Sequence, residues 1–212
     1  MLDRETPPSA GVSNGMEPRT IIFVGPQGSG KGTQIARLSA SLKEQNPNRR
    51  VVDIQTGRRF RALAAKQEGY TEMHVSETLN TGILQPLFLS VVLWGDAFQN
   101  QVDEDCHVLI DGFPRTVHEA HVLESAFAFY KRTPITVVHL DTPESVVRAR
   151  MIGRAREDDT PESIEARLTW YREETLPVVE YYRARPDTNV IDIDGTHTID
   201  EVAESIHTHI FV

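Results

Sequence analysis

The sequence predicts an α/β fold with a five-stranded parallel sheet and helices on both faces. Short apolar runs rich in β-branched residues alternate five times with stretches of helical periodicity. This alternation is typical of parallel strands joined by helical crossovers. Gly25, Thr56, Asp111 and Asp141 each follow such a run. Because ligands bind at the carboxyl ends of parallel strands, we expect a ligand site at this edge, with the first three residues close together.

The first run, 21–24, leads into the stretch Gly25-Pro-Gln-Gly-Ser-Gly-Lys-Gly-Thr33, and a helical pattern follows. Strand, glycine-rich turn and helix form the context of a phosphate-binding loop. The glycines let backbone N–H groups turn toward an anion, and the start of the helix adds its positive dipole end. Lys31 supplies a full charge, whereas Gly32 stands where Ser or Thr usually ligates magnesium and Thr33 comes one position later. The alternative is a glycine-rich turn without a ligand.

The remaining elements are expected in the same alternation. Strands are predicted at 51–54, 107–110, 135–140 and 190–193. Helices are predicted at 58–66, 71–80, 86–102 and 117–130, from Pro143 onward, from Pro161 to about Arg183 with a disturbance at Pro177, and at 199–207. About fifty mostly helical residues separate the second strand from the third, which is long for a crossover and indicates a mobile helical insert at about 55–102.

Composition limits the classes of protein. The chain has 212 residues, of which 39% are hydrophobic, and this suits one domain over 19–212. Residues 1–18 have the composition of a flexible leader. No apolar run of 18 residues predicts a membrane span. The single cysteine, Cys106, excludes an internal disulfide and a cysteine cluster for zinc, and it indicates a cytoplasmic enzyme.

The charge pattern favours a small polyanion as ligand. The net charge of −9 argues against nucleic acid as a partner. The positive charge is concentrated, however, in a run of arginines: Arg148, Arg150, Arg154, Arg156 and Arg167. The alternative is a solvated helix face.

Asp111 ends the apolar run 107–110 and is the expected metal-associated residue. A carboxylate here can hold Mg²⁺ directly or through water. The alternative is a turn-forming Asp before Gly112. Together with the phosphate-binding loop, Asp111 indicates a magnesium–nucleotide site.

Two motifs carry a specific resemblance to a known family. The stretch 25–34 resembles the phosphate loop of adenylate kinases and the wider nucleoside monophosphate kinase family, and Asp111-Gly-Phe-Pro-Arg-Thr116 is similar to a signature of that family. Thr56-Gly57 with Arg61 resembles its acceptor motif, and the arginines from 150 to 167 resemble a short lid at about 153–160 with its flanking arginines. The match covers about residues 20–208. It implies a P-loop NTPase-like fold with an acceptor-binding insert, and the reaction Mg·ATP + AMP = 2 ADP in nucleotide biosynthesis.

The resemblance also implies roles for individual residues. ATP would be bound by Gly28, Ser29, Gly30, Lys31, Gly32, Thr33 and Arg150. The acceptor would be bound by Thr56, Gly57, Arg61, Ile83, Leu84, Gly112, Arg115 and Glu119. The transferring phosphoryl group would be surrounded by Lys31, Arg115, Arg154, Arg156 and Arg167. Asp111 would organise Mg²⁺ through water, and the enzyme is expected to be a monomer without nucleic-acid or membrane partners.

Three departures from the family leave alternatives open. Arg58 stands where the family usually has Asp, and the short lid lacks the cysteines that bind structural zinc in long-lid members. Glu119 replaces the usual Gln, and a carboxylate suits the two adjacent donors of guanine better than adenine. A kinase for GMP, or for UMP or CMP, is therefore an alternative, although Thr116 favours the adenylate branch. A nucleotide-binding switch or ATPase module is less favoured, because Arg61 and Arg115 would give it an unneeded second phosphate clamp.

Overall fold

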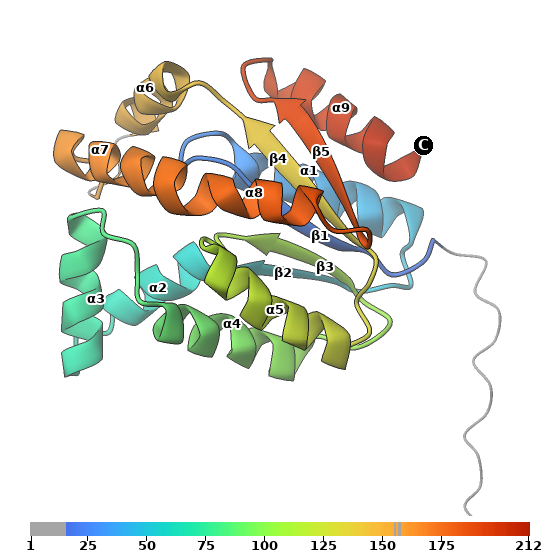
Figure 1. The fold of residues 1–212 in the computed structure, drawn as a ribbon, viewed down its shortest axis with the longest axis horizontal. Helices are drawn as coiled ribbons and strands as arrows, with labels where there is room; N and C mark the ends of the chain where they lie inside the picture. The colour runs from blue at the N-terminus through green and yellow to red at the C-terminus, as the bar shows by residue number, and fades with distance from the viewer. Residues whose placement is uncertain (1–15, 155, 157) are drawn as a thin grey trace, which may run out of the picture.

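The computed structural model describes residues 16–154, 156 and 158–212; the predicted leader falls almost entirely outside this range. All five predicted strands form, in one parallel sheet with the order β2-β3-β1-β4-β5 (Figure 1). The strands are β1 (Thr20–Val24), β2 (Val51–Gln55), β3 (His107–Asp111), β4 (Ile135–Asp141) and β5 (Thr188–Asp194). The central position of β1 places the loop that follows it in the middle of the carboxyl edge of the sheet.

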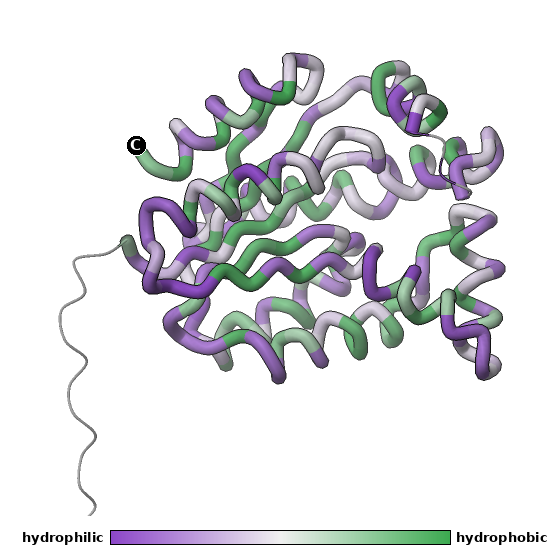
Figure 2. Tube along the Cα trace, turned by 180° about the vertical axis from the view of Figure 1, so that it is seen from behind, coloured by the Kyte–Doolittle hydropathy of each residue, from purple (hydrophilic) through white to green (hydrophobic). Residues whose placement is uncertain are grey.

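Helices cover both faces of the sheet, as predicted. Helices α1 (Lys31–Gln45) and α9 (Ile199–Phe211) pack on one face, and α4 (Leu87–Gln101), α5 (Val117–Phe129) and α8 (Leu176–Arg183) pack on the other. Alternate residues of β1 belong to the two hydrophobic cores. Ile21 and Phe23 lie in the core beneath α1 and α9, and Ile22 and Val24 lie in the core beneath α4, α5 and α8. A parallel strand covered on both faces is therefore mostly apolar, and Figure 2 shows green stretches along the strands in the middle of the molecule.

Helices α2 (Thr56–Ala64), α3 (Tyr70–Asn80) and α4 fill the chain between β2 and β3. Phe60, Val75 and Leu89, one from each helix, meet in a small core of their own. In Figure 1, α3 stands at the end of the molecule away from the sheet. No helix in the described ranges combines the length and the apolar character needed to cross a membrane.

The long helical pattern after Pro161 is divided in a different place from that predicted. Helix α6 (Glu144–Arg154) precedes α7 (Pro161–Trp170), which continues through a π-helical turn, η1 (Tyr171–Thr175), into α8. The disturbance predicted at Pro177 thus lies one turn earlier. The reason is that proline lacks an N–H and its ring clashes with the carbonyl four residues before it, so the preceding turn widens.

A buried arginine forms hydrogen bonds at the amino ends of β1 and β3. Arg132 is 3% exposed, and its guanidinium donates to Thr20 Oγ1 at 2.9 Å and to the carbonyl oxygens of Cys106 at 2.6 Å, Arg19 at 3.1 Å, and Asp103 and Glu104 at 3.3 Å each. These acceptors lie at the start of β1 and in the residue before it, and in the turn before β3. Because the contacts join segments distant in sequence, no local pattern predicts them.

Candidate active site

A cavity of about 490 Å³ opens at the carboxyl edge of the sheet, where the sequence places the ligand. Among the described residues that line it, one acid, Asp111, faces seven basic side chains: Lys31, Arg58, Arg61, Arg115, Arg150, Arg154 and Arg156. Gly25 and Asp111 line it as expected, and Thr56 lies directly beside it with its Oγ1 2.8 Å from Gly112 O; Asp141 is not a lining residue. So strong an excess of positive charge suits a polyanion with several phosphate groups.

The phosphate-binding loop forms one wall of this cavity. Gly28 has a φ of 90°, and a Cβ there would lie 2.8 Å from the carbonyl oxygen of Val147 in α6. Glycine is therefore required for the loop to pass beneath α6. Gly30 precedes α1 and has no side chain that could cap the helix. Residues of the first turn, Lys31, Gly32 and Thr33, line the cavity, so the positive end of the helix dipole lies where an anion can bind.

Lys31 begins α1 and lines the cavity together with Gly32 and Thr33. Its Nζ donates to the carbonyl oxygens of Gly25 at 2.7 Å and Pro26 at 2.9 Å. Burial lowers the pKa of Lys31, and the Asp111 carboxylate opposes this shift. Ser29 is buried and is not a lining residue; its carbonyl accepts from Arg150 Nη1 at 3.4 Å.

Arg115 on the opposite wall is fixed through both its backbone and its side chain. Its Nε donates to Gly112 O at 2.7 Å, its N–H donates to Glu119 Oε2 at 2.7 Å, and its carbonyl accepts from Thr175 Oγ1 at 2.8 Å. The guanidinium carbon lies 5.1 Å from the ring centroid of Trp170, within cation–π range. Burial lowers the pKa of Arg115. Contacts within the protein therefore fix the position of the Arg115 guanidinium.

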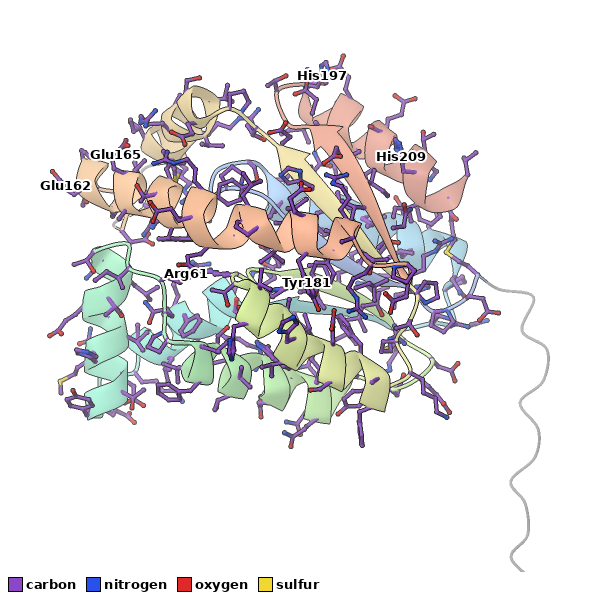
Figure 3. The ribbon with its side chains drawn as sticks, in the orientation of Figure 1. Arg61, Glu162, Glu165, Tyr181, His197 and His209 are labelled. Carbon is purple, nitrogen blue, oxygen red and sulfur yellow. The ribbon has the colours of Figure 1, made fainter. Side chains whose placement is uncertain are left out.

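Some residues of the acceptor motif line the cavity, and one is buried in the interior. Gly57 and Arg61, both from α2, line the cavity (Figure 3 labels Arg61), and burial lowers the pKa of Arg61. Thr56 is fully buried, and its Oγ1 donates to Gly112 O at 2.8 Å. Thr56 therefore joins the end of β2 to the loop after β3. Arg58 lines the cavity with its Nη1 3.7 Å from Asp53 Oδ2.

The arginines of the predicted lid region separate into two kinds. Arg150, Arg154 and Arg156 line the cavity, whereas Arg167 does not. Arg167 is 4% exposed and donates to Asp159 Oδ1 at 2.6 Å, Asp158 Oδ2 at 2.8 Å and the carbonyl of Leu79 in α3 at 3.2 Å. Two residues of the predicted lid, 155 and 157, lie outside the described residues.

Asp159 pairs with two of these arginines. Its carboxylate also accepts from Arg154 Nε at 2.5 Å and Nη2 at 3.0 Å. Burial alone would raise the pKa of Asp159, but the two guanidinium groups lower it below its ordinary value. Asp159 belongs to no motif of its own, and the signal in the sequence is its position five residues after Arg154 and eight before Arg167.

A second cavity of about 110 Å³ shares Arg115 with the first and is lined by Leu84, Thr116 and Glu119, among others. Glu119 is 3% exposed. Its Oε1 accepts from Ser90 Oγ at 2.6 Å and Trp94 Nε1 at 3.2 Å, and its Oε2 accepts from the Arg115 N–H. Glu119 is therefore not a solvent-exposed helix residue; its role in reading a base stays a prediction. Ile83 is 56% exposed and does not line either cavity.

The cavity suits Mg²⁺ brought in with a nucleotide. Among the described residues, no three His, Cys, Asp or Glu side chains gather as a group that could hold a metal. Mg²⁺ in nucleotide sites needs only one or two carboxylates, with phosphates and water completing its shell. Asp111 supplies such an oxygen donor inside the cavity.

Comparison with known proteins agrees with this geometry. The family model for adenylate kinase matches residues 23–186. The chain is 36% identical to an adenylate kinase of Corynebacterium aurimucosum, with 86% of this chain and 94% of that protein covered. It is 34% identical to one of Nocardia farcinica, covering 87% and 94%, and 33% identical to one of Xanthomonas campestris pv. campestris, covering 88% and 96%. The phosphate-binding loop, the arginine-lined cavity and these similarities together show that the chain belongs to the adenylate kinase family of phosphotransferases, which transfer a phosphoryl group between ATP and AMP.

Proposed function

We propose that this chain catalyses Mg·ATP + AMP = 2 ADP, with the phosphates of both nucleotides in the 490 Å³ cavity. The observation that carries the proposal is the set of seven basic side chains around a single acid among the described lining residues. The attacking atom is a phosphate oxygen that is already ionised at neutral pH, so no side-chain base is needed. The site has to supply positioning and positive charge, which is what this wall offers.

On the donor side, the phosphate-binding loop would hold the ATP phosphates. The residues are Gly28, Gly30, Lys31, Gly32 and Thr33, with Ser29 contributing its backbone. Lys31 would release its two carbonyl partners and turn its ammonium to the terminal phosphates. Arg150, which lies beside Ser29 O, would face the donor base.

On the acceptor side, Arg61 and Arg115 would clamp the AMP phosphate, with Gly57 and Gly112 allowing close approach. The smaller cavity, which shares Arg115 with the larger, would hold the acceptor base beside Leu84 and Glu119. Thr56 would act through its hydrogen bond to Gly112, and the backbone near Ile83 would complete the ribose site.

Between the two nucleotides, Arg154 and Arg156 would face the transferring phosphoryl group together with Lys31 and Arg115. Arg167 would support them through Asp159, which it shares with Arg154. Mg²⁺, when bound with ATP, neutralises charge on the donor phosphates. Asp111 would hold that ion through water.

We further propose that residues 19–212 act as one domain with two closing parts. These are the acceptor insert, at about 55–102, and a short lid at about 153–160. Closure would exclude water as a competing phosphoryl acceptor. The proposal is supported by the contact of Arg167, on α7 beyond the lid, with Leu79 in the acceptor insert.

The enzyme is proposed to be a cytoplasmic monomer that needs no nucleic acid or membrane. The phosphate-binding loop, the acceptor arginines and the lid arginines all line one cavity of a single chain, so the proposed reaction needs no residue from a second copy. The net charge of −9 disfavours a nucleic-acid partner, and the lone buried Cys106 fits a reducing compartment.

A coupled assay with ATP and a panel of AMP, GMP, UMP and CMP tests the reaction. AMP is expected to give the highest kcat/KM. Arg115→Lys keeps the charge but loses the bidentate fork, so KM for AMP should rise much more than KM for ATP. A selective rise in KM for ATP would show that donor and acceptor sites are assigned the wrong way round.

A further inference from the structure

Trp170 lies where three parts of the molecule meet. It is the last residue of α7, it lines the large cavity, and it is partly exposed. Its ring faces the Arg115 guanidinium at 5.1 Å, and its Nε1 donates to the carbonyl of Gly82 at 3.0 Å. One side chain therefore contacts both the arginine proposed to hold the acceptor phosphate and the acceptor insert.

The contact at Gly82 depends on close approach of two backbones. Gly82 has a φ of 74°, and a Cβ there would lie 2.5 Å from the carbonyl oxygen of Ser163 in α7. Glycine thus lets the turn that follows α3 in the insert rest against α7. Trp170 from one end of α7 and Arg167, which donates to Leu79 O, each hold a carbonyl of the same turn of the insert.

The segment that follows Trp170 is held by hydrogen bonds to the sheet and to Arg115. The π-helical turn η1 begins at the next residue, Tyr171, whose hydroxyl lies 3.1 Å from Nε2 of His139 in β4. At the end of the same turn, Thr175 donates to the carbonyl of Arg115. The turn is therefore anchored at both ends, and these anchors hold the preceding residue, Trp170, with its ring beside the Arg115 guanidinium.

From these contacts we propose that Trp170 is a positioning residue for the acceptor phosphate: its ring orients the Arg115 guanidinium, and its N–H couples that orientation to the docked acceptor insert. The inference rests on the proposed role of Arg115 at the acceptor. Docking of the insert places Gly82 O on the indole N–H, which holds the ring over the guanidinium. AMP, which needs both the insert and Arg115, then gains from the coupling, whereas ATP does not.

Two variants separate the two contacts. Trp170→Phe keeps a ring but loses the N–H, so KM for AMP should rise about threefold. Trp170→Leu also loses the cation–π contact with Arg115, so KM for AMP should rise roughly ten- to thirtyfold. KM for ATP should change less than about twofold in both, a split that a general packing defect would not produce. Tyr181→Leu is the matched control, because it removes another arginine–aromatic contact, with Arg185 at 5.8 Å, on α8 away from the cavity (Figure 3 labels Tyr181).

The same assay on Arg115→Lys keeps this inference separate from the proposed function. If Arg115→Lys raises KM for AMP selectively and Trp170→Leu acts much more weakly in that background, the coupling is supported. If Arg115→Lys is selective but Trp170→Leu raises both KM values equally, or neither, the role of Trp170 is overturned and the acceptor assignment stands. If Arg115→Lys is not selective for AMP, the acceptor assignment fails and this inference fails with it.

Discussion

Replacing Glu119 by glutamine should destabilise the protein, although the two side chains have nearly the same shape. The carboxylate accepts three hydrogen bonds, from Ser90, Trp94 and the Arg115 N–H. A glutamine has one acceptor oxygen and an NH₂ group that can only donate. If the oxygen faces Ser90 and Trp94, the NH₂ opposes the Arg115 N–H; if the amide is reversed, the NH₂ opposes the indole N–H of Trp94.

In either orientation one buried donor loses its partner. The cost of such a loss is about 1–3 kcal/mol. For a domain of this size, each kcal/mol lowers Tm by roughly 2–4 °C. Urea titration and thermal melting of Glu119→Gln should therefore show a loss of about 1–3 kcal/mol in the free energy of unfolding, which is larger than surface Glu→Gln changes produce.

A second substitution should recover part of the loss. In Glu119→Gln with Trp94→Phe, the reversed amide can donate to the Ser90 hydroxyl while its oxygen accepts from Arg115. The double variant should thus be more stable than the sum of the single changes predicts, by about 1 kcal/mol. Parent-like stability of Glu119→Gln, or strict additivity with Trp94→Phe, would refute the hydrogen-bond account. The sequence pattern by itself predicts that Glu119→Gln improves kcat/KM for AMP by about 1–2 kcal/mol, and kinetics on the same samples test that separately.

Three other perturbations have expected outcomes. Lys31→Ala should lower kcat by about two to three orders of magnitude with little change in Tm, since a single preorganised charge is lost; near-native kcat in a coupled assay would remove Lys31 from the mechanism. Arg132→Met should lower the free energy of unfolding in urea by about 3 kcal/mol or more, because several buried carbonyls lose their donor. Arg172 is half-exposed, and Arg172→Met is a control that should lower the same free energy by less than about 1 kcal/mol. Burial lowers the pKa of His107 from 6.5 to about 4, so below pH 6.5 the unfolded chain binds a proton that the native state does not. Stability should therefore fall between pH 6.5 and 4, by up to about 3 kcal/mol, and His107→Asn should flatten this part of the profile; an unchanged slope would contradict the assignment.

Much of the site could be predicted because its signals are local. The phosphate-binding loop is encoded by glycines and Lys31 over nine residues, and the apolar runs before it and before Asp111 reveal buried parallel strands. Parallel strands end at the same edge, so the meeting of Gly25 and Asp111 follows from element type alone. The run of arginines likewise indicated the polyanion cavity, to which Arg150, Arg154 and Arg156 contribute.

The tertiary structure decided which partners each charged or polar group has. The family motif predicts Glu119 at the acceptor base but not its partners; its donors Ser90 and Trp94 lie 29 and 25 residues away in the sequence and bury its carboxylate. Arg167 belongs to the predicted phosphoryl clamp by motif; in this structure it does not line the cavity, and its guanidinium donates to Asp159 and to the carbonyl of Leu79. Trp170 carries no motif, because its partners Arg115 and Gly82 are defined by the docking of separate elements. Periodicity and turn chemistry report the local backbone and its burial, whereas contacts between elements depend on how the whole chain packs, and these determine which of the predicted site residues face the ligand.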